Sequence, residues 1–274
     1  MISQVYFIII NLNCLRGSIL HKKLALLHMK PEKADLAKNR RILENALDKA
    51  AEHQVDWLIT PELCTSGYCF DNEIGHNWIS PQPDRWTTRF LNRAGQAGIC
   101  LFLACPEQDR ESGRYYNSVL VFEPGFGIRG RHRKIAVQKG SESWSSKGET
   151  AKPILCQGVR VGVIICADAW YEEIPLGLKE QGAQIFISPA AWPPEPYSPY
   201  PCWESITRKT GLPLVICNRT GQEDDLPFYA SESLVMKDGR KLAAYASEEP
   251  ALLTINWDFE SMQPLDSDFC RISI

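Results

Sequence analysis

The sequence predicts a layered α/β fold in a single domain, and three observations support this. Short apolar runs rich in β-branched residues alternate along the chain with segments whose apolar residues recur at helical spacing. Hairpin signals join several neighbouring runs. No linker-like stretch is long enough to divide the 274 residues. We therefore expect sheets and helices to stack as a sandwich around one core.

Composition and charge narrow the function classes. Hydrophobic residues make up 44% of the chain and charged residues 23%, values near globular averages that exclude a disordered or fibrous protein. The formal net charge is -3, so no bulk positive field exists to hold a polyanion, and we expect no nucleic-acid partner. No stretch approaches the roughly 18 uninterrupted apolar residues of a membrane-spanning helix, and we expect no membrane partner.

Strands and helices alternate in the first part of the chain. Residues 24–27 form a short apolar run, which predicts a buried strand, and residues 33–53 carry leucines at helical spacing, which predicts a helix. Residues 57–60 form a second apolar strand. A helix over residues 84–97 is ended by a glycine and is followed by a strand over residues 99–104.

The middle of the chain predicts a hairpin and a central strand. Residues 117–122 form a strand, residues 123–130 contain the Pro and Gly of a turn, and residues 131–137 are expected to return as a strand. Residues 159–165 form a strongly β-branched run that ends directly on Cys166. Side chains at such a strand end are well placed to meet a ligand.

The last part of the chain continues the same alternation. Its expected elements are a helix over residues 174–181, a strand over 184–188, a proline-rich loop over 193–201, a helix over 203–210, a strand over 214–218, a hairpin of 232–236 and 241–245 around the turn 237–240, and a strand over 251–255.

The amino-terminal segment is expected to lie outside this fold. Its apolar run, residues 5–10, has no basic residue before it and no small-residue cleavage site after it, so it predicts neither a signal peptide nor a membrane span. We assign residues 1–22 to an N-terminal extension and residues 23–274 to the folded domain.

The ten cysteines are scattered through apparent strands and loops, which favours a reduced, cytoplasmic setting. One alternative is a zinc site formed by Cys64 with Cys69 and Cys100 with Cys105. Each pair is separated by four residues rather than the usual two, and we expect no metal.

A glycine pattern at residues 125–130 resembles a dinucleotide-binding loop, which requires a helix after it. Residues 131–134 are basic and have no helical apolar face, so a hairpin turn is expected instead. The chain also lacks a G-x-S-x-G elbow and a Walker loop. Serine hydrolases and nucleotide-binding enzymes of these types are therefore not indicated.

Three side chains follow predicted strands or turns and share one chemistry. Cys166 ends a buried strand, Glu62 follows another strand, and Lys134 lies in the returning arm of the hairpin. Taken singly, each has a structural explanation: a buried cysteine, a strand-end carboxylate and a surface charge. The sequence motifs around the three residues favour a shared catalytic role over these separate structural explanations.

These surroundings resemble the nitrilase, or carbon-nitrogen hydrolase, superfamily over roughly residues 24–256. Any one matching motif is weak evidence, whereas the complete set in the family's order is specific. The matching motifs are Pro61-Glu62-Leu63 with Gly67-Tyr68, Tyr116-Asn117-Ser118, Arg133-Lys134-Ile135, Cys166-Ala167-Asp168, Gly182-Ala183 with Pro189-Ala190-Ala191-Trp192, and Asn218-Arg219-Thr220-Gly221.

The resemblance implies a Glu62, Lys134 and Cys166 triad on a four-layer α-β-β-α sandwich, with no metal, no organic cofactor and assembly as a homodimer or larger homo-oligomer. The chemistry is consistent with it. A free thiol with a pKa near 8.5 is only a few per cent thiolate at neutral pH, so a nucleophilic cysteine needs a base or a nearby positive charge. Glu62 can take the proton, and Lys134 can supply the charge.

The resemblance also implies supporting groups. Members of the family often carry a second glutamate between the lysine and the cysteine. Glu142 matches best and Glu149 is the alternative. The Lys134 ammonium and the backbone amide of Ala167 are the candidate donors to negative charge that develops on the substrate.

An aspartate two positions after the nucleophile resembles the amidase and carbamoylase branches more than the true nitrilases. The expected partner is therefore a small amide or N-carbamoyl compound. The alternatives are a nitrile hydrolase and a catalytically inactive binding protein on the same fold. We expect aromatic side chains in the substrate pocket, with core packing as the alternative for each: Tyr68, Tyr116, Trp144, Trp170 and Trp192.

Overall fold

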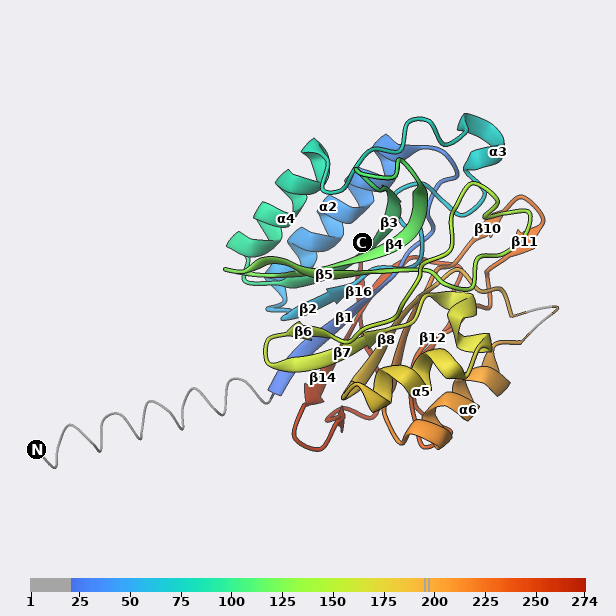
Figure 1. Ribbon diagram of the computed structural model, residues 1–274. Coiled ribbons are helices and arrows are strands. Elements are labelled where there is room, and N and C mark those ends of the chain that lie inside the picture. Colours follow the sequence, from blue (N-terminus) through green and yellow to red (C-terminus); the bar gives the residue numbers. More distant parts are fainter. Residues whose placement is uncertain (1–20, 195, 197) are drawn as a thin grey trace, which may run out of the picture.

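The computed structural model describes residues 21–194, 196 and 198–274. Two β-sheets face each other between two layers of helices (Figure 1). The strands of the first sheet are β1 (His21–His28), β2 (Trp57–Ile59), β3 (Cys100–Gln108), β4 (Tyr115–Glu123), β5 (Gly127–Arg133), β14 (Ala251–Asp258), β15 (Gln263–Pro264) and β16 (Cys270–Ser273). Their order is β15-β14-β1-β2-β3-β4-β5, and β16 also pairs with β14.

The second sheet has six strands in the order β13-β12-β9-β8-β7-β6. They are β6 (Ile154–Cys156), β7 (Val159–Val163), β8 (Ile185–Ala190), β9 (Leu214–Asn218), β12 (Ser233–Lys237) and β13 (Arg240–Tyr245). The central strands β7, β8 and β9 run parallel, as do β1, β2 and β3 in the first sheet. A short hairpin of β10 (Gln222–Glu223) and β11 (Leu226–Pro227) stands apart from both sheets.

Helices α2 (Leu36–Glu52) and α4 (Arg85–Gln96) cover the outer face of the first sheet, and α5 (Glu173–Glu180) and α6 (Tyr200–Thr210) cover that of the second (Figure 1). Two shorter elements complete the described fold: helix α3 (Asp71–Ile74) and the 3-10 helix η1 (Cys166–Trp170). The predicted α-β-β-α sandwich in one domain is confirmed.

Alternating side chains on the central strands build two cores. Leu24 and Leu26 of β1 pack between the sheets, whereas Ala25 and Leu27 pack against the layer of α2 and α4. Because both faces of a strand are buried in this architecture, the strands read as continuous apolar runs. This explains why short runs without polar alternation were sufficient to predict them.

The helix starts follow local capping chemistry. The Asp35 side chain accepts a hydrogen bond from the Lys38 N–H at the start of α2, and the Asp84 side chain accepts one from the Thr87 N–H at the start of α4. Each carboxylate satisfies a backbone donor that the helix itself leaves unpaired.

Several predicted boundaries are wrong. His21 and Lys22 belong to β1, where they pair with Asp258 and Trp257, so the folded domain starts before residue 23. The rest of the predicted extension, residues 1–20, lies outside the described residues. The local sequence carried no signal for this pairing because the partner strand is more than 200 residues away.

The hairpin of β4 and β5 is longer and tighter than expected. Both strands extend into the region predicted as the turn 123–130, since pairing runs from Ser118 with Arg133 to Glu123 with Gly127. Strand β5 ends at Arg133, so the prediction of a strand over 131–137 is wrong beyond that residue, and Lys134 lies just past the strand end.

The later hairpin matches its sequence signal. Strands β12 and β13 pair in the antiparallel sense, with Lys237 opposite Arg240. Asp238 and Gly239 both have positive φ, 51° and 72°, the conformation that a two-residue turn between twisted strands requires.

Two absences hold for the part of the chain that the structure describes. It contains no helix both long and apolar enough to span a bilayer. It also contains no group of three or more His, Cys, Asp or Glu side chains placed to hold a metal ion.

A substitution at Gly162 would test how tightly the second sheet is packed. A Cβ on this residue would lie 2.7 Å from the Phe186 ring on the neighbouring strand. We expect Gly162→Ala to lower the free energy of unfolding by about 1 to 3 kcal/mol because the ring must shift within a packed layer. Gly177→Ala in α5, where a Cβ meets nothing within 4 Å, is the control and should be neutral or slightly stabilising. Equal urea midpoints for the two variants would refute this account of the packing.

Candidate active site

The candidate site lies where loops leave the two facing sheets. Glu62 follows β2, Lys134 follows β5, and Cys166 follows β7 after two further residues. Ala191 directly follows β8. In this fold the ends of parallel strands from both sheets come to one edge, which brings together side chains far apart in the sequence.

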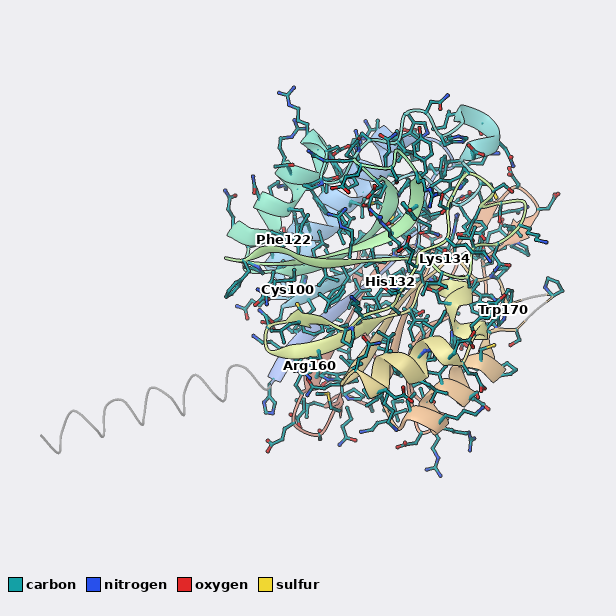
Figure 2. The ribbon with its side chains drawn as sticks, viewed as in Figure 1. Cys100, Phe122, His132, Lys134, Arg160 and Trp170 are labelled. Atoms are coloured by element: carbon teal, nitrogen blue, oxygen red, sulfur yellow. The ribbon has the colours of Figure 1, made fainter. Side chains whose placement is uncertain are left out.

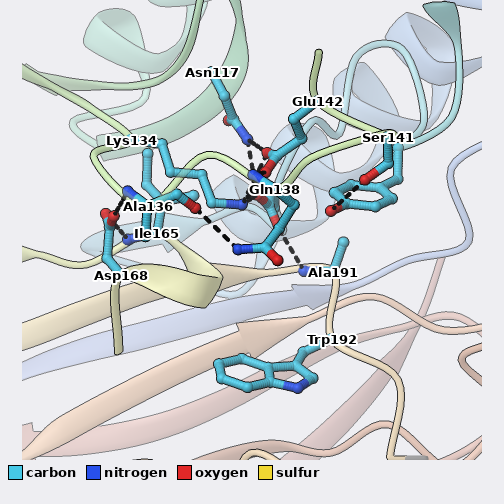
Figure 3. Close-up of polar contacts among 12 residues, drawn as sticks. Asn117, Lys134, Ala136, Gln138, Ser141, Glu142, Ile165, Asp168, Ala191 and Trp192 are labelled. Carbon is cyan, nitrogen blue, oxygen red and sulfur yellow. Dashed lines mark hydrogen bonds and ion pairs between the residues drawn. The ribbon is translucent and has the colours of Figure 1, made fainter. Parts of the chain in front are cut away.

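Lys134 is the centre of a buried ion cluster (Figure 3). Its Nζ lies 2.7 Å from Oε1 of Glu62 and 2.8 Å from each carboxylate oxygen of Glu142. The side chains of all three residues are fully buried. The ammonium therefore binds two carboxylates away from water, where charge-assisted hydrogen bonds are strong.

Neighbouring backbone groups fix the position of Lys134. Its N–H donates to the Asn117 carbonyl, and its carbonyl accepts from the Gly148 N–H, both at 2.8 Å. A Cβ on Gly148 would lie 2.1 Å from the Arg133 carbonyl oxygen. The segment around residue 148 can therefore approach the backbone of Arg133 this closely only because residue 148 is glycine.

Asn117 links the two carboxylates of the cluster. Its Nδ2 donates to Oε1 of Glu62 at 2.8 Å and to Oε1 of Glu142 at 2.6 Å. Tyr116 was the residue of this motif predicted for the site, and Asn117 was not predicted. Neighbouring strand residues face opposite sides of a sheet, and the Tyr116 ring instead lies under the Arg133 guanidinium, 4.1 Å from it.

Cys166 begins the 3-10 helix η1 with φ of 44°. This left-handed conformation is unfavourable for a residue with a side chain, and such strain is concentrated at functional turns. Cys166 lines a cavity of about 340 Å³ together with Ala167. The Ala191 N–H donates to Oε2 of Glu62 at 2.9 Å and also interacts with the Cys166 sulfur. One amide therefore joins the carboxylate and the thiol.

The pKa values of the ion cluster reflect competition between burial and charge. Burial alone would lower the pKa of Lys134, but the carboxylates of Glu62 and Glu142 outweigh it and raise the pKa well above its ordinary value. Burial raises the pKa of Glu142, with a further increase from Glu62 and an opposing effect from Lys134. Lys134 therefore stays charged across the physiological range.

The surroundings of Cys166 disfavour a preformed thiolate. Burial and the negative charge of Glu62 raise the pKa of Cys166 well above 9.0, and the nearby Lys134 opposes this only in part. A resting Cys166 is therefore a neutral thiol. Of the two routes to activation that the sequence left open, this environment favours proton transfer to a base over a lowered pKa.

Asp168 ties the nucleophile turn to the lysine loop. Its carboxylate accepts hydrogen bonds from the Ala136 N–H at 2.8 Å and the Ile165 N–H at 3.0 Å (Figure 3). It also accepts one from the Ile135 N–H at 2.9 Å. His132 of β5 donates through Nε2 at 2.8 Å. Figure 2 shows His132 near Lys134 in the interior of the fold. From the sequence, Asp168 indicated only the branch of the family and hence the substrate class.

Opposing effects also set the pKa of Asp168. Burial raises it, but the bond from His132 and the bonds from the backbone amides outweigh burial, and the pKa of this carboxyl is lowered below 3.8. Asp168 is thus an ionised acceptor at neutral pH, and its charge is stabilised by donors from both segments.

A second anchor holds the opposite wall of the cavity. The Asn218 side chain accepts from the Trp192 N–H at 3.0 Å and donates to the Trp192 carbonyl at 2.9 Å. This reciprocal pair fixes the backbone directly after Ala191. The sequence marked Asn218 within a family motif but gave it no role.

Three of the five predicted pocket aromatics line the cavity at Cys166: Tyr68, Trp170 and Trp192. The indole rings of Trp170 and Trp192 meet edge to face with their centroids 5.1 Å apart. Trp144 instead packs against Phe70, with centroids 5.0 Å apart. Neither Trp144 nor Tyr116 is among the described residues that line this cavity. For these two, the structure supports the packing explanation.

Of the two candidates for the second glutamate, the structure brings Glu142 to Lys134. Glu142 also accepts a hydrogen bond from the Gln138 N–H at 2.8 Å. Glu149 is exposed and lines two other surface hollows. The sequence spacing from Lys134 to Glu142 had favoured the same choice.

The arrangement combines a protonated thiol, an adjacent carboxylate and a fixed ammonium at a cavity with largely apolar walls. A model of the carbon-nitrogen hydrolase family matches residues 23–266. The chain belongs to this family, which is also called the nitrilase superfamily. The match spans nearly the whole described fold.

Individual members of the carbon-nitrogen hydrolase family agree with this assignment. A probable nitrilase of Schizosaccharomyces pombe is 22% identical over 90% of this chain and 92% of its own length. An (R)-stereoselective amidase of a Pseudomonas species is 26% identical over 90% of this chain and 89% of its own. A nitrilase-superfamily member of Saccharomyces cerevisiae superposes with a TM-score of 0.77 at 23% identity, covering 89% of this chain and 94% of that one.

A solved amidase of Nesterenkonia has the same fold, with a TM-score of 0.77 at 20% identity, over 89% of this chain and 93% of that one. That structure is of a mutant in which a glutamate is replaced by leucine, and the acetamide moiety of fluoroacetamide is covalently bound to its active-site cysteine. At these identities the structural likeness establishes the sandwich architecture of the hydrolase family for this chain.

The Asp168 anchor makes a testable prediction for stability. In Asp168→Asn, the new NH₂ group faces donors from Ile165 or His132, so buried donors lose their acceptor. We expect the free energy of unfolding at pH 7 to fall by about 3 kcal/mol. Asp48→Asn on α2, where the carboxylate is exposed and paired with Arg93, is the control and should have little effect.

The stability difference between wild type and Asp168→Asn should depend on pH in one direction. Because the pKa of Asp168 is lowered in the folded state, its stabilisation is complete above the unfolded pKa and is lost as pH falls through the folded one. Urea titrations should therefore show a constant gap between wild type and Asp168→Asn from pH 7 down to about 4, and a narrowing gap below it. A gap that widens on acidification would contradict the assignment.

Proposed function

We propose that this protein hydrolyses the carbon-nitrogen bond of a small amide or N-carbamoyl compound through a covalent acyl-enzyme on Cys166. The observation that carries the proposal is the buried contact of Glu62 with Lys134 beside a thiol that opens on a cavity. This provides a base, a fixed positive charge and a nucleophile in one place. In a mutant Nesterenkonia amidase, the active-site cysteine carries the acetamide moiety of fluoroacetamide, which supports the role of Cys166 as a nucleophile here.

In the first half-reaction, the Cys166 sulfur attacks the carbonyl carbon while Glu62 takes the thiol proton. The C=O π bond becomes a C–O⁻ group, which the Lys134 ammonium and the Ala167 N–H stabilise. Such donors typically contribute 10²- to 10³-fold in rate, or about 3 to 4 kcal/mol. The proton moves within the cluster, so the net charge of the buried groups does not change during activation.

The tetrahedral adduct then re-forms its carbonyl and the C–N bond breaks. Protonated Glu62 gives its proton to the departing nitrogen, which leaves as ammonia or an amine. Glu62, again a carboxylate, takes a proton from water, whose oxygen attacks the thioester. Breakage of the C–S bond releases the acid, and the sulfur takes the proton back from Glu62.

Glu142 and Asn117 support this cycle without exchanging protons in it. Both bind the same groups that react: Glu142 holds the Lys134 ammonium, and Asn117 holds Glu62. An ammonium shared by two carboxylates keeps its place when Glu62 becomes protonated, because Glu142 still balances its charge.

The cavity and its sequence surroundings favour amides over nitriles. The Cys166-Ala167-Asp168 stretch resembles amidase and carbamoylase members, and a volume of about 340 Å³ is near the lower limit for ligand pockets. Nitrile hydrolysis is the second candidate, because the relatives include a probable nitrilase. The proposal includes no metal and no organic cofactor, a cytoplasmic location and assembly into homo-oligomers.

An ammonia-release panel tests the proposal. We expect hydrolysis of short amides or N-carbamoyl amino acids, with nitriles turned over at least tenfold more slowly. Cys166→Ala should abolish turnover, and Lys134→Met should lower kcat at least a hundredfold because the oxyanion loses its charged donor. Cys270→Ala, which removes an exposed thiol, is the control and should behave as wild type.

Circular dichroism must first show that each variant keeps the wild-type fold. Near-normal turnover by folded Cys166→Ala would exclude the covalent mechanism. Ammonia release from nitriles but not from amides would favour the second candidate, and no release from any class would favour an inactive binding protein.

A further inference from the structure

The cavity at Cys166 has an uneven distribution of charge. Its walls are mainly apolar and aromatic and include Trp170, Trp192, Pro193 and Leu226. Among the described residues that line it, Lys139 is the one lysine, arginine, histidine, aspartate or glutamate. A substrate bound in this cavity would therefore meet a cation.

Lys139 is available to bind a ligand. It is exposed, and within the described part of the chain it has no hydrogen-bond or ion-pair partner. The catalytic carboxylates are committed elsewhere, because Lys134 binds both Glu62 and Glu142 in the buried cluster. Because its ammonium has no partner among the described residues, Lys139 can pair with a charged group of a ligand at the rim of this apolar cavity.

The backbone on both sides of Lys139 is fixed. The Gln138 N–H donates to Oε2 of Glu142 at 2.8 Å, and the Gly140 N–H donates to Oγ of Ser143 at 3.0 Å. Beyond it, the Ser141 hydroxyl donates to Oη of Tyr68 at 3.1 Å. The loop that holds Glu142 against Lys134 thus also fixes the backbone that carries Lys139, which is among the residues that line the cavity.

From these observations we propose that the substrate carries a carboxylate on its acyl side, a few bonds from the scissile C–N bond, and that Lys139 binds this carboxylate. The inference rests on the proposed amide hydrolysis and specifies its substrate class. An acidic amide would place its methylene groups against the aromatic walls, its amide carbon at Cys166 and its anionic end at the Lys139 ammonium. A substrate with a terminal amine would meet like charge at the same place.

One feature argues for the opposite charge. Trp170 is 42% exposed, and an indole face can attract an organic cation. A direct ammonium-to-ammonium approach at Lys139 opposes this, and the same wall can pack equally well on methylene groups. Amides of equal length and different terminal charge decide between the two.

The test uses glutaramate, neutral valeramide and cationic 5-aminovaleramide with wild type, Lys139→Met and Lys139→Glu. We expect wild-type kcat/KM to be about tenfold higher for glutaramate than for valeramide, mostly through KM. The ratio should fall to about one in Lys139→Met, and Lys139→Glu should prefer 5-aminovaleramide. Lys147→Met removes an exposed lysine outside this cavity and should keep the wild-type preference.

Ionic strength provides an independent readout. Since Lys139 is exposed, the preference for glutaramate should shrink when salt is raised from about 0.02 M to about 0.5 M, as the screening length falls. A preference that came only from the shape of the cavity would not change.

The outcomes separate this inference from the proposed function. Equal turnover of glutaramate and valeramide by wild type, or a preference that survives in Lys139→Met, overturns the role of Lys139 and leaves amide hydrolysis standing. A preference for 5-aminovaleramide by wild type also overturns it and favours the indole wall. Failure of wild type to hydrolyse any amide contradicts both.

Discussion

The structure depends on one buried ammonium that binds two carboxylates. Removing three charged groups from water costs several kcal/mol for each, and only a full set of hydrogen bonds offsets that cost. The cluster has this set: Lys134 bridges Glu62 and Glu142, Asn117 donates to both acids, and backbone N–H groups of Gln138 and Ala191 complete them. With the thiol neutral, two carboxylates and one ammonium give the cluster one net negative charge.

This charge balance explains why the nucleophile is held as a thiol. A lone lysine beside a cysteine would lower the pKa of the thiol, whereas a lysine already neutralised by two acids does so only weakly. The raised pKa of Cys166 follows from that balance. A protonated thiol is a weak nucleophile, so in the proposed mechanism the adjacent Glu62 takes its proton as the sulfur attacks.

Sequence reasoning succeeded where a residue follows a strand and failed where the partner is distant. Glu62, Lys134 and Cys166 follow runs that are readable locally, and the order of their motifs identified the family. Asn117 was missed in favour of Tyr116 because the motif does not show which face of β4 meets the site. Asp168 was missed as an anchor because its donors Ile135 and Ala136 lie 32 or more positions away. Similarly, β1 starts at His21 because it pairs with β14, which no local pattern reveals.

The central claim is that Cys166 is a neutral thiol activated by Glu62. The most direct measurement is the ultraviolet thiolate signal of Cys166, taken as the pH-dependent difference spectrum between wild type and Cys166→Ala. Because the pKa is raised well above 9.0, we expect no thiolate signal from Cys166 between pH 6 and pH 9.0. A thiolate signal with a midpoint below neutral pH would contradict the account, since Lys134 would then have ionised the sulfur without any need for Glu62.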